Sequence, residues 1–181
     1  MGPIAALDPG RYLRPRLSPF FDLADDEDVF PPIEPSAEVR VRLLRSVSGA
    51  ERFAPFVDRF AELFALTAEA ARALFVRAED PAEWSSPMPG LQCLRFESGL
   101  EGAECWLARF AAGLRYPRHR HLGRELAMVL EGGYTDSDGS LVIPGDVRLG
   151  EKGSSHGLSV HADGDCTAAL AIWGGIEILG A

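Results

Sequence analysis

The spacing of hydrophobic residues changes character along the chain. Between residues 36 and 79 apolar side chains recur every three to four positions, which is the period of an amphipathic helix. The pattern predicts three helices: one starting at Ser36 and ending before Gly49, one over residues 53–64, and one capped by Thr67. The second helix has the strongest pattern, with Phe53, Phe56, Val57, Phe60, Leu63 and Phe64 on one face. A helical piece this short is a weak fold by itself, so we expect it to pack on the following domain or on a partner.

From Trp84 onward the helical period disappears and short apolar segments alternate with turns. "LQCLRFE", "AECWLARF", "ELAMVLEGGYTD" and "CTAALAIW" are separated by clusters such as "DSDGS", "PGD" and "ADGD". This spacing predicts a mainly β fold, either a sandwich or a barrel. The chain therefore divides into a tail over residues 1–35, a helical region over 36–80 and a β domain over 84–178.

The predicted tail is rich in proline and acidic residues, and it shows no periodicity that would indicate a helix or a strand. It holds seven of the 13 prolines and the run "DLADDED", so we expect it to be disordered or draped over a surface. Its large apolar residues indicate that it packs either on its own domain or on a partner; these are Phe20, Phe21, Val29, Phe30 and Ile33.

Composition argues against several classes of protein: nucleic-acid binding, membrane-spanning and disulfide-rich. The 181 residues carry a formal net charge of −9, which argues against direct binding to a nucleic-acid backbone. No apolar run is long enough to span a membrane, and no basic segment followed by an apolar one resembles a signal peptide. The three cysteines are odd in number and lack the CxxC spacing of a zinc clip, so we interpret them as small apolar residues of strands in a reducing cytoplasm.

Two of the four histidines are separated by a single residue, and a glutamate follows four positions after the second of them. In a strand that runs on without a bulge, His119, His121, Gly123 and Glu125 point to one face, and Gly123 leaves room between the side chains. Two neutral imidazoles and a carboxylate on one face are typical ligands of a divalent metal. His156, 31 residues after Glu125, can return to the same interior through a hairpin. His161 has the opposite parity to His156, so we expect it on the surface or beside the site, not among the ligands.

The stretch "GLRYPRHRHLGRELAMVLEGG" resembles the first signature of the cupins, G-x5-H-x-H-x3-E-x6-G, with every spacing intact. A second cupin signature is recognisable from Gly145, with Gly153 and His156 in place, while Glu151 and Val160 stand where the family has Pro and Asn. The resemblance implies a double-stranded β-helix, the cupin or jelly-roll barrel. It also implies that one divalent metal is held by four residues: His119, His121, Glu125 and His156.

Within the cupins, two runs are similar to the cupin-like domain of ChrR-type zinc anti-sigma factors: "PRHRHLGRELAMVLEGGYTDSDGSLVIPGD" and "SSHGLSVHADGDC". The similarity implies a sensing or regulatory module in transcription linked to oxidative stress, with a regulatory protein as partner. It favours zinc over iron, manganese and nickel. Residues 1–92 contain neither His nor Cys. The zinc-binding module through which those regulators bind a sigma factor is therefore absent or replaced.

An enzyme is the alternative, because a metal with open positions supports Lewis-acid or O₂ chemistry. The predicted interior is small and apolar at Ala127 and Val129, with Trp106 and Tyr116 near the mouth, and it offers no evident general base. A dioxygenase is compatible with that interior, and a purely structural ion is a third reading. A small-molecule ligand in the barrel is compatible with either of the first two.

The segment after Glu125 is apolar on both faces, because Leu126, Met128 and Leu130 alternate with the inward Ala127 and Val129. Such a strand is covered on both sides. Packing of the chain's own Phe-rich helix against the outer face of this strand is the simpler interpretation. A second subunit on that face is the other, since the resemblance to cupins implies a homodimer.

Overall fold

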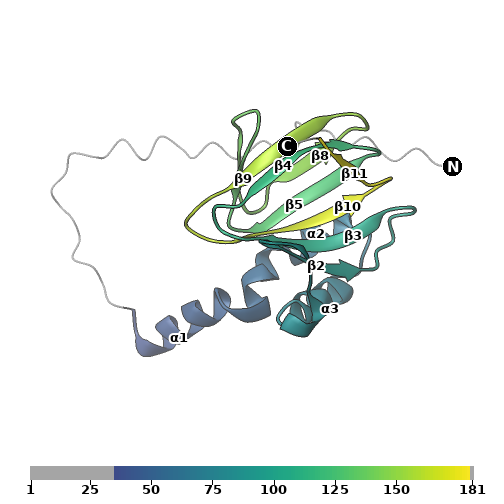
Figure 1. Ribbon diagram of the computed structural model, residues 1–181. Coiled ribbons are helices and arrows are strands. Elements are labelled where there is room, and N and C mark those ends of the chain that lie inside the picture. The colour runs from purple at the N-terminus through teal and green to yellow at the C-terminus, as the bar shows by residue number, and fades with distance from the viewer. Residues whose placement is uncertain (1–34, 180–181) are drawn as a thin grey trace, which may run out of the picture. The chain divides into compact units, whose positions relative to one another are not determined.

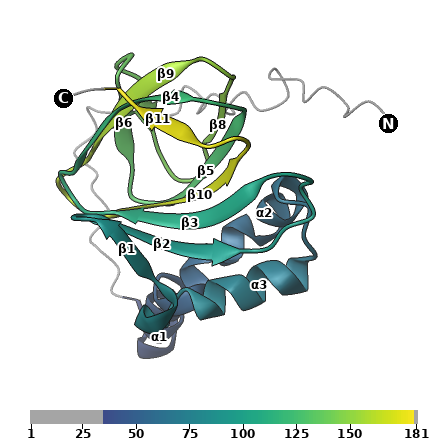
Figure 2. The ribbon, with the colours of Figure 1, turned by 45° about the vertical axis from the view of Figure 1, so that its right-hand side comes forward.

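The computed structural model describes residues 35–179. The predicted tail, except for Pro35, lies outside these residues. Two antiparallel sheets stack to form the barrel, and the helices lie beneath one of them (Figures 1 and 2).

The helical region begins with α1 (Ala37–Ser46) and ends with α3 (Ala68–Arg77), close to the predicted bounds. Thr67 caps α3 as predicted, because its side-chain oxygen accepts a hydrogen bond from the Ala70 N–H at 3.1 Å. A 3₁₀ turn, η4 (Pro81–Glu83), then leads into the first strand.

The predicted second helix is not one continuous α-helix. The segment is a 3₁₀ helix, η3 (Gly49–Phe56), followed directly by the short α2 (Val57–Leu63). Pro55 lies inside η3 and has no backbone N–H to donate to an α-helical hydrogen bond, so the α-helical pattern starts only after it. The apolar face survives this change, since Phe53, Phe60 and Phe64 are each at most 1% exposed.

The strands of the described residues form two sheets, as a mainly β prediction requires. The six-stranded sheet has the order β1-β2-β3-β10-β5-β8, and the five-stranded sheet has the order β11-β4-β9-β6-β7. Their bounds are β1 Ser85–Met88, β2 Leu91–Phe96, β3 Glu104–Phe110, β4 Arg115–His121, β5 Glu125–Glu131, β6 Tyr134–Asp136, β7 Leu141–Val142, β8 Val147–Gly150, β9 Ser155–Val160, β10 Cys166–Ile172 and β11 Ile176–Ile178. The pairing between neighbouring strands is antiparallel throughout.

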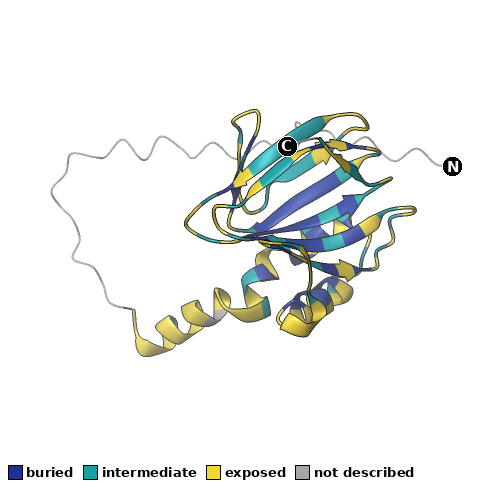
Figure 3. Cartoon of the chain, viewed as in Figure 1, coloured by how far each residue is buried: buried dark blue, intermediate teal, exposed yellow. Residues whose placement is uncertain are grey.

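The six-stranded sheet is buried on both faces at its centre, which Figure 3 shows as the dark strand β5. On the outer face, Leu126, Met128 and Leu130 share a core with the aromatic residues Phe60 and Phe64 of the helical region. On the inner face, Val129 belongs to a second core that fills part of the barrel. The chain's own helices therefore cover the apolar outer face, which was the plainer of the two predicted covers.

The first helix differs from the others, because three of its apolar side chains are mostly exposed in the described residues. Leu43 is 54% exposed, Leu44 61% and Val41 51%, and α1 is drawn almost wholly in the exposed colour in Figure 3. None of the helices in residues 35–179 has the length and apolarity needed to cross a membrane.

Candidate metal centre

Three histidines meet on the inner face of the five-stranded sheet. His119 in β4 and His156 in β9 are direct cross-strand partners, so their side chains emerge side by side. His121 lies two residues further along β4 and therefore points to the same face. The ring centroids of His119 and His156 are 4.5 Å apart, and those of His121 and His156 are 5.1 Å apart. One nitrogen from each ring falls within 4.8 Å of the others, so the three residues can hold a single metal ion.

The state of the ring nitrogens fits a metal centre. His119 and His121 are only 4% and 3% exposed. His121 Nδ1, His121 Nε2 and His156 Nε2 are buried and have no hydrogen-bond partner among the described residues. A buried polar atom without a partner costs about 1–3 kcal/mol, and a divalent ion supplies the missing partner for imidazole nitrogen.

Burial also keeps the imidazoles neutral, which is the form that binds metal. Burial, helped by the neighbouring His156 and His121, lowers the pKa of His119 to about 4, although a hydrogen bond to the Pro117 carbonyl opposes the shift. Burial likewise lowers the pKa of His121. The rings of His119 and His121 are therefore in the neutral form at neutral pH, with a single proton shared between two ring nitrogens.

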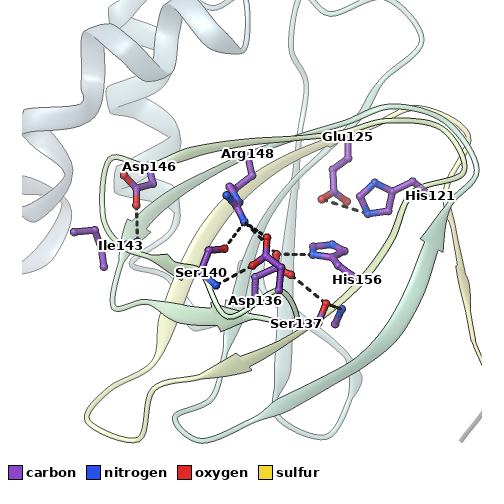
Figure 4. A network of polar contacts seen from close by, with 11 residues as sticks. His121, Glu125, Asp136, Ser137, Ser140, Ile143, Asp146, Arg148 and His156 are labelled. Carbon is purple, nitrogen blue, oxygen red and sulfur yellow. Dashed lines mark hydrogen bonds and ion pairs between the residues drawn. The ribbon is translucent and has the colours of Figure 1, made fainter. Parts of the chain in front are cut away.

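Glu125 reaches the histidines by a route that differs from the predicted one. The strand carrying His119 and His121 ends at His121, the chain turns over residues 122–124, and Glu125 opens β5 in the opposite sheet. Its Oε1 atom nevertheless lies 3.9 Å from His121 Nε2 (Figure 4). Burial raises the pKa of the Glu125 carboxyl, so in the metal-free protein its ionised form is disfavoured.

Gly123 does not have the predicted role of leaving room between the imidazoles and the carboxylate. A Cβ at this position would lie 1.6 Å from the Trp173 carbonyl oxygen. The glycine instead lets the turn between the two sheets pass close to the Trp173 backbone. Gly150 is the residue that leaves room for the site, because a Cβ there would lie 2.0 Å from His121 Nδ1.

Asp136 is part of the site, and the sequence reasoning missed it. The His156 Nδ1–H donates to Asp136 Oδ2 at 2.9 Å, and the Arg148 guanidinium lies 3.6 Å from the same oxygen (Figure 4). Burial by itself raises the pKa of Asp136, but the hydrogen bond and the charge of His156 outweigh it and lower the pKa. The alternation in "GGYTD" held a signal for this residue, because it puts a carboxylate on the same strand face as the apolar Tyr134.

The histidine cluster borders an apolar cavity of about 280 Å³ inside the barrel. Trp106 and Tyr116 line it, where the mouth was predicted, and His119, His156 and Glu125 form its polar part. A polar depression of about 410 Å³ reaches the other side of the cluster and includes His121, Asp136 and Arg148. His161 is outside the cluster: its Nε2 atom lies 3.3 Å from Thr135 Oγ1.

The family model described as the ChrR cupin-like domain matches residues 72–173, which is more than half of the chain. The chain belongs to the ChrR cupin-like family. The predicted cupin barrel is thus confirmed, and so is the similarity to the ChrR subgroup. None of the curated proteins matches this sequence.

Solved structures are also similar to this ChrR cupin-like chain. A chain of the crystal structure of Rhodobacter sphaeroides SigE in complex with the anti-sigma ChrR is 22% identical, with a TM-score of 0.53 over 78% of this chain and 69% of that one. An RmlC-like cupin protein from Ralstonia eutropha is 21% identical, with a TM-score of 0.49 over 56% of this chain and 70% of that one. An acetylacetone dioxygenase from Acinetobacter johnsonii is 15% identical, with a TM-score of 0.48 over 56% and 74% of the two chains.

Proposed function

We propose that residues 84–178 form a metal-binding sensing or regulatory module in stress-linked transcription. One divalent ion is held by His119, His121, Glu125 and His156, with zinc favoured over iron, manganese and nickel. The three clustered imidazoles carry this proposal, together with the unpartnered buried nitrogens of His121 and His156. Membership of the ChrR cupin-like family supports the regulatory part of the proposal.

The donor set supports the choice of metal. Imidazole nitrogen and carboxylate oxygen suit zinc and also the redox metals iron, manganese and nickel. When bound, the ion supplies a positive charge and open or exchangeable coordination positions. The chain's own residues prepare the ligands for the ion: His119 and His121 are kept neutral by burial, and Asp136 orients the ring of His156.

The partner in this proposal is a cytoplasmic regulatory protein, and a second copy of the chain forms a homodimer as in other cupins. A sigma factor is one such partner, because the related structure is a complex of SigE with the anti-sigma ChrR. The absence of His and Cys from residues 1–92 implies that any such contact is made without zinc ligands in this region. Crosslinking of the full chain in cells, with and without oxidant, tests for the partner, and light scattering tests for the dimer.

Metal content decides the central part of the proposal. The full chain is purified without chelators, and its metals are measured by elemental mass spectrometry beside His121→Ala and the control His161→Ala. We expect near-stoichiometric zinc in the wild type and in His161→Ala, and its loss in His121→Ala. An absence of metal from the wild type, or equal zinc in both variants, would contradict the proposal.

A metal-dependent enzyme such as a dioxygenase is the second candidate. It is favoured by the apolar cavity beside the cluster and by Glu125, a partly buried carboxyl whose raised pKa suits proton transfer. Iron, manganese or nickel in protein from the native host, together with O₂ uptake, would make this candidate the leading one. Zinc alone would leave the regulatory module in place.

A further inference from the structure

The barrel cavity beside the histidine cluster has a sharply divided lining. Its walls are mostly aliphatic and aromatic, as in Leu91, Trp106, Phe110, Leu158, Leu170 and Ile172. The polar groups of His119, His156 and Glu125 gather where the cavity meets the cluster. No lysine or arginine of the described residues lines the cavity, so phosphates and multiply charged ligands find no basic side chain there.

The cavity exists because three strands place small residues at its wall. Ala108 in β3, Ala127 in β5 and Ala168 in β10 all line it and are nearly fully buried. Ala169, the next residue along β10 after Ala168, faces the other way and belongs to the core beneath the helices. A volume of about 280 Å³ accommodates a molecule of roughly a dozen non-hydrogen atoms, if each takes about 20 Å³ at protein packing density.

Two tyrosines add hydrogen-bond donors to this lining. Tyr116 and Tyr134 both border the cavity, and Tyr134 is only 5% exposed. Each can therefore donate to an oxygen atom of a bound molecule.

We propose that this cavity is a binding site for a compact, mainly apolar molecule with a single oxygen-bearing head group that faces the histidine cluster. The proposal rests on the proposed metal function, because the ion gives the head group its strongest partner. Apolar walls favour a dry ligand body, and the few polar groups at one end fix its orientation. Sugars and other polyols are excluded, since most of their hydroxyls would lose their hydrogen bonds to water at apolar walls.

The test uses the zinc-loaded full chain and NMR of its alanine methyl groups. Acetophenone, an aromatic ketone within the size limit, is the probe, and glucose of comparable size is the polar control. We expect acetophenone to shift the methyl signals of Ala108, Ala127 and Ala168 in a saturable way and to leave Ala169 in place. Glucose is expected to shift none of them. No shift with acetophenone, or equal shifts with glucose, would overturn the proposal.

Two variants test the cavity and one tests the head group. Ala168→Leu fills the space, so acetophenone binding should weaken at least about tenfold while zinc content stays unchanged. If Ala168→Leu does not fold, Leu170→Ala enlarges the cavity and should admit 2-acetylanthracene, which is larger than the molecule that the wild-type cavity accommodates. In His121→Ala, loss of the metal should weaken acetophenone about tenfold; unchanged affinity would refute the orientation of the head group.

The two proposals fail in different ways. If the wild type carries no metal, the proposed function is wrong whatever the methyl signals show. If zinc is bound and the cavity methyl groups do not respond to acetophenone, only the ligand proposal is wrong.

Discussion

His156 Nδ1 lies 2.9 Å from Asp136 Oδ2, and this hydrogen bond directs the other ring nitrogen of His156 toward His119 and His121. A carboxylate accepts but does not donate, so the Nδ1 atom of His156 carries a proton, and in the neutral ring Nε2 keeps its lone pair. His156 Nε2 is buried and has no other partner among the described residues. The pair is therefore arranged as a carboxylate–histidine unit ready for a metal ion.

Asp136→Asn should weaken metal binding without unfolding the chain. The amide has the same shape but no charge, so it holds His156 less firmly, and loss of such a partner typically costs about 10–100-fold in metal affinity. Competition with a chromogenic chelator measures the affinity. Asp138→Asn is the control, because that carboxylate is exposed and contacts Arg148 but not His156. Equal affinities for the two variants would show that the orienting hydrogen bond is unimportant.

Glu125→Gln should change the metal-free and the zinc-loaded protein in opposite directions. Burial disfavours the ionised carboxylate, so the neutral amide should slightly stabilise the metal-free fold at pH 7. The same change removes the charge of the proposed fourth ligand and should reduce zinc affinity by roughly tenfold or more. Thermal unfolding with and without zinc gives both effects. A variant that zinc stabilises as much as the wild type would exclude Glu125 from the ligand set.

Gly150→Ala should disturb His121 although it adds only a methyl group. The new Cβ would lie 2.0 Å from His121 Nδ1 and 3.3 Å from Glu125 Cβ, so the ring must move. Overpacking of this kind typically costs about 1–3 kcal/mol of stability, and displacement of a ligand weakens metal binding as well. Gly164→Ala is the matched control, because nothing lies within 4 Å of its added Cβ. Denaturant unfolding and chelator competition check the two effects, and equal behaviour of the two variants would contradict the prediction.

The metal-free protein should lose stability as the pH falls from about 6.5 to 4. The pKa of His119 is lowered by burial to about 4, whereas an unfolded histidine keeps a value near 6.5. Between these values the unfolded chain binds more protons, so the contribution is fully present above pH 6.5 and is lost on acidification. With allowance for solvent screening it is of the order of 2 kcal/mol.

Denaturant unfolding across this pH range measures the effect, with His119→Asn as the comparison. The variant lacks the titrating group at this position, so its stability should fall less steeply toward pH 4. An identical slope in both proteins would show that His119 is not responsible.

Phe60→Ala should destabilise the whole chain and not only the helical region. Phe60 is 0% exposed and stacks on Phe64 at 4.7 Å, within the core that the helices share with the six-stranded sheet. Truncation of a buried Phe typically costs about 3–5 kcal/mol. Val76→Ala, at a side chain that is 64% exposed, should change stability by less than about 0.5 kcal/mol. Cooperative unfolding followed by far-UV circular dichroism checks both; a loss confined to helix signal would show separate folding units.

Local patterns were sufficient for much of the site. His119 and His121 share a strand face because side chains alternate with a period of two, and no distant contact is needed to know this. The turn-rich spacing after Trp84 predicted the β domain, and the helical period predicted the apolar faces of α2 and α3. Pro55 shows where pattern alone was misleading, because the hydrophobic period continued through a residue that cannot complete an α-helix.

The sequence by itself determined which residue types meet: imidazoles on one strand, a carboxylate soon after, and a barrel whose signatures include both. Only the tertiary structure decided that Glu125 approaches from the opposite sheet, that Asp136 holds His156, and that the helices cover Leu126, Met128 and Leu130. The cavity beside the cluster was also decided there, by alanines from three strands. The physical reason is range: parity and helical period act between neighbours along the chain, whereas these contacts join segments that become neighbours only when the two sheets close on each other.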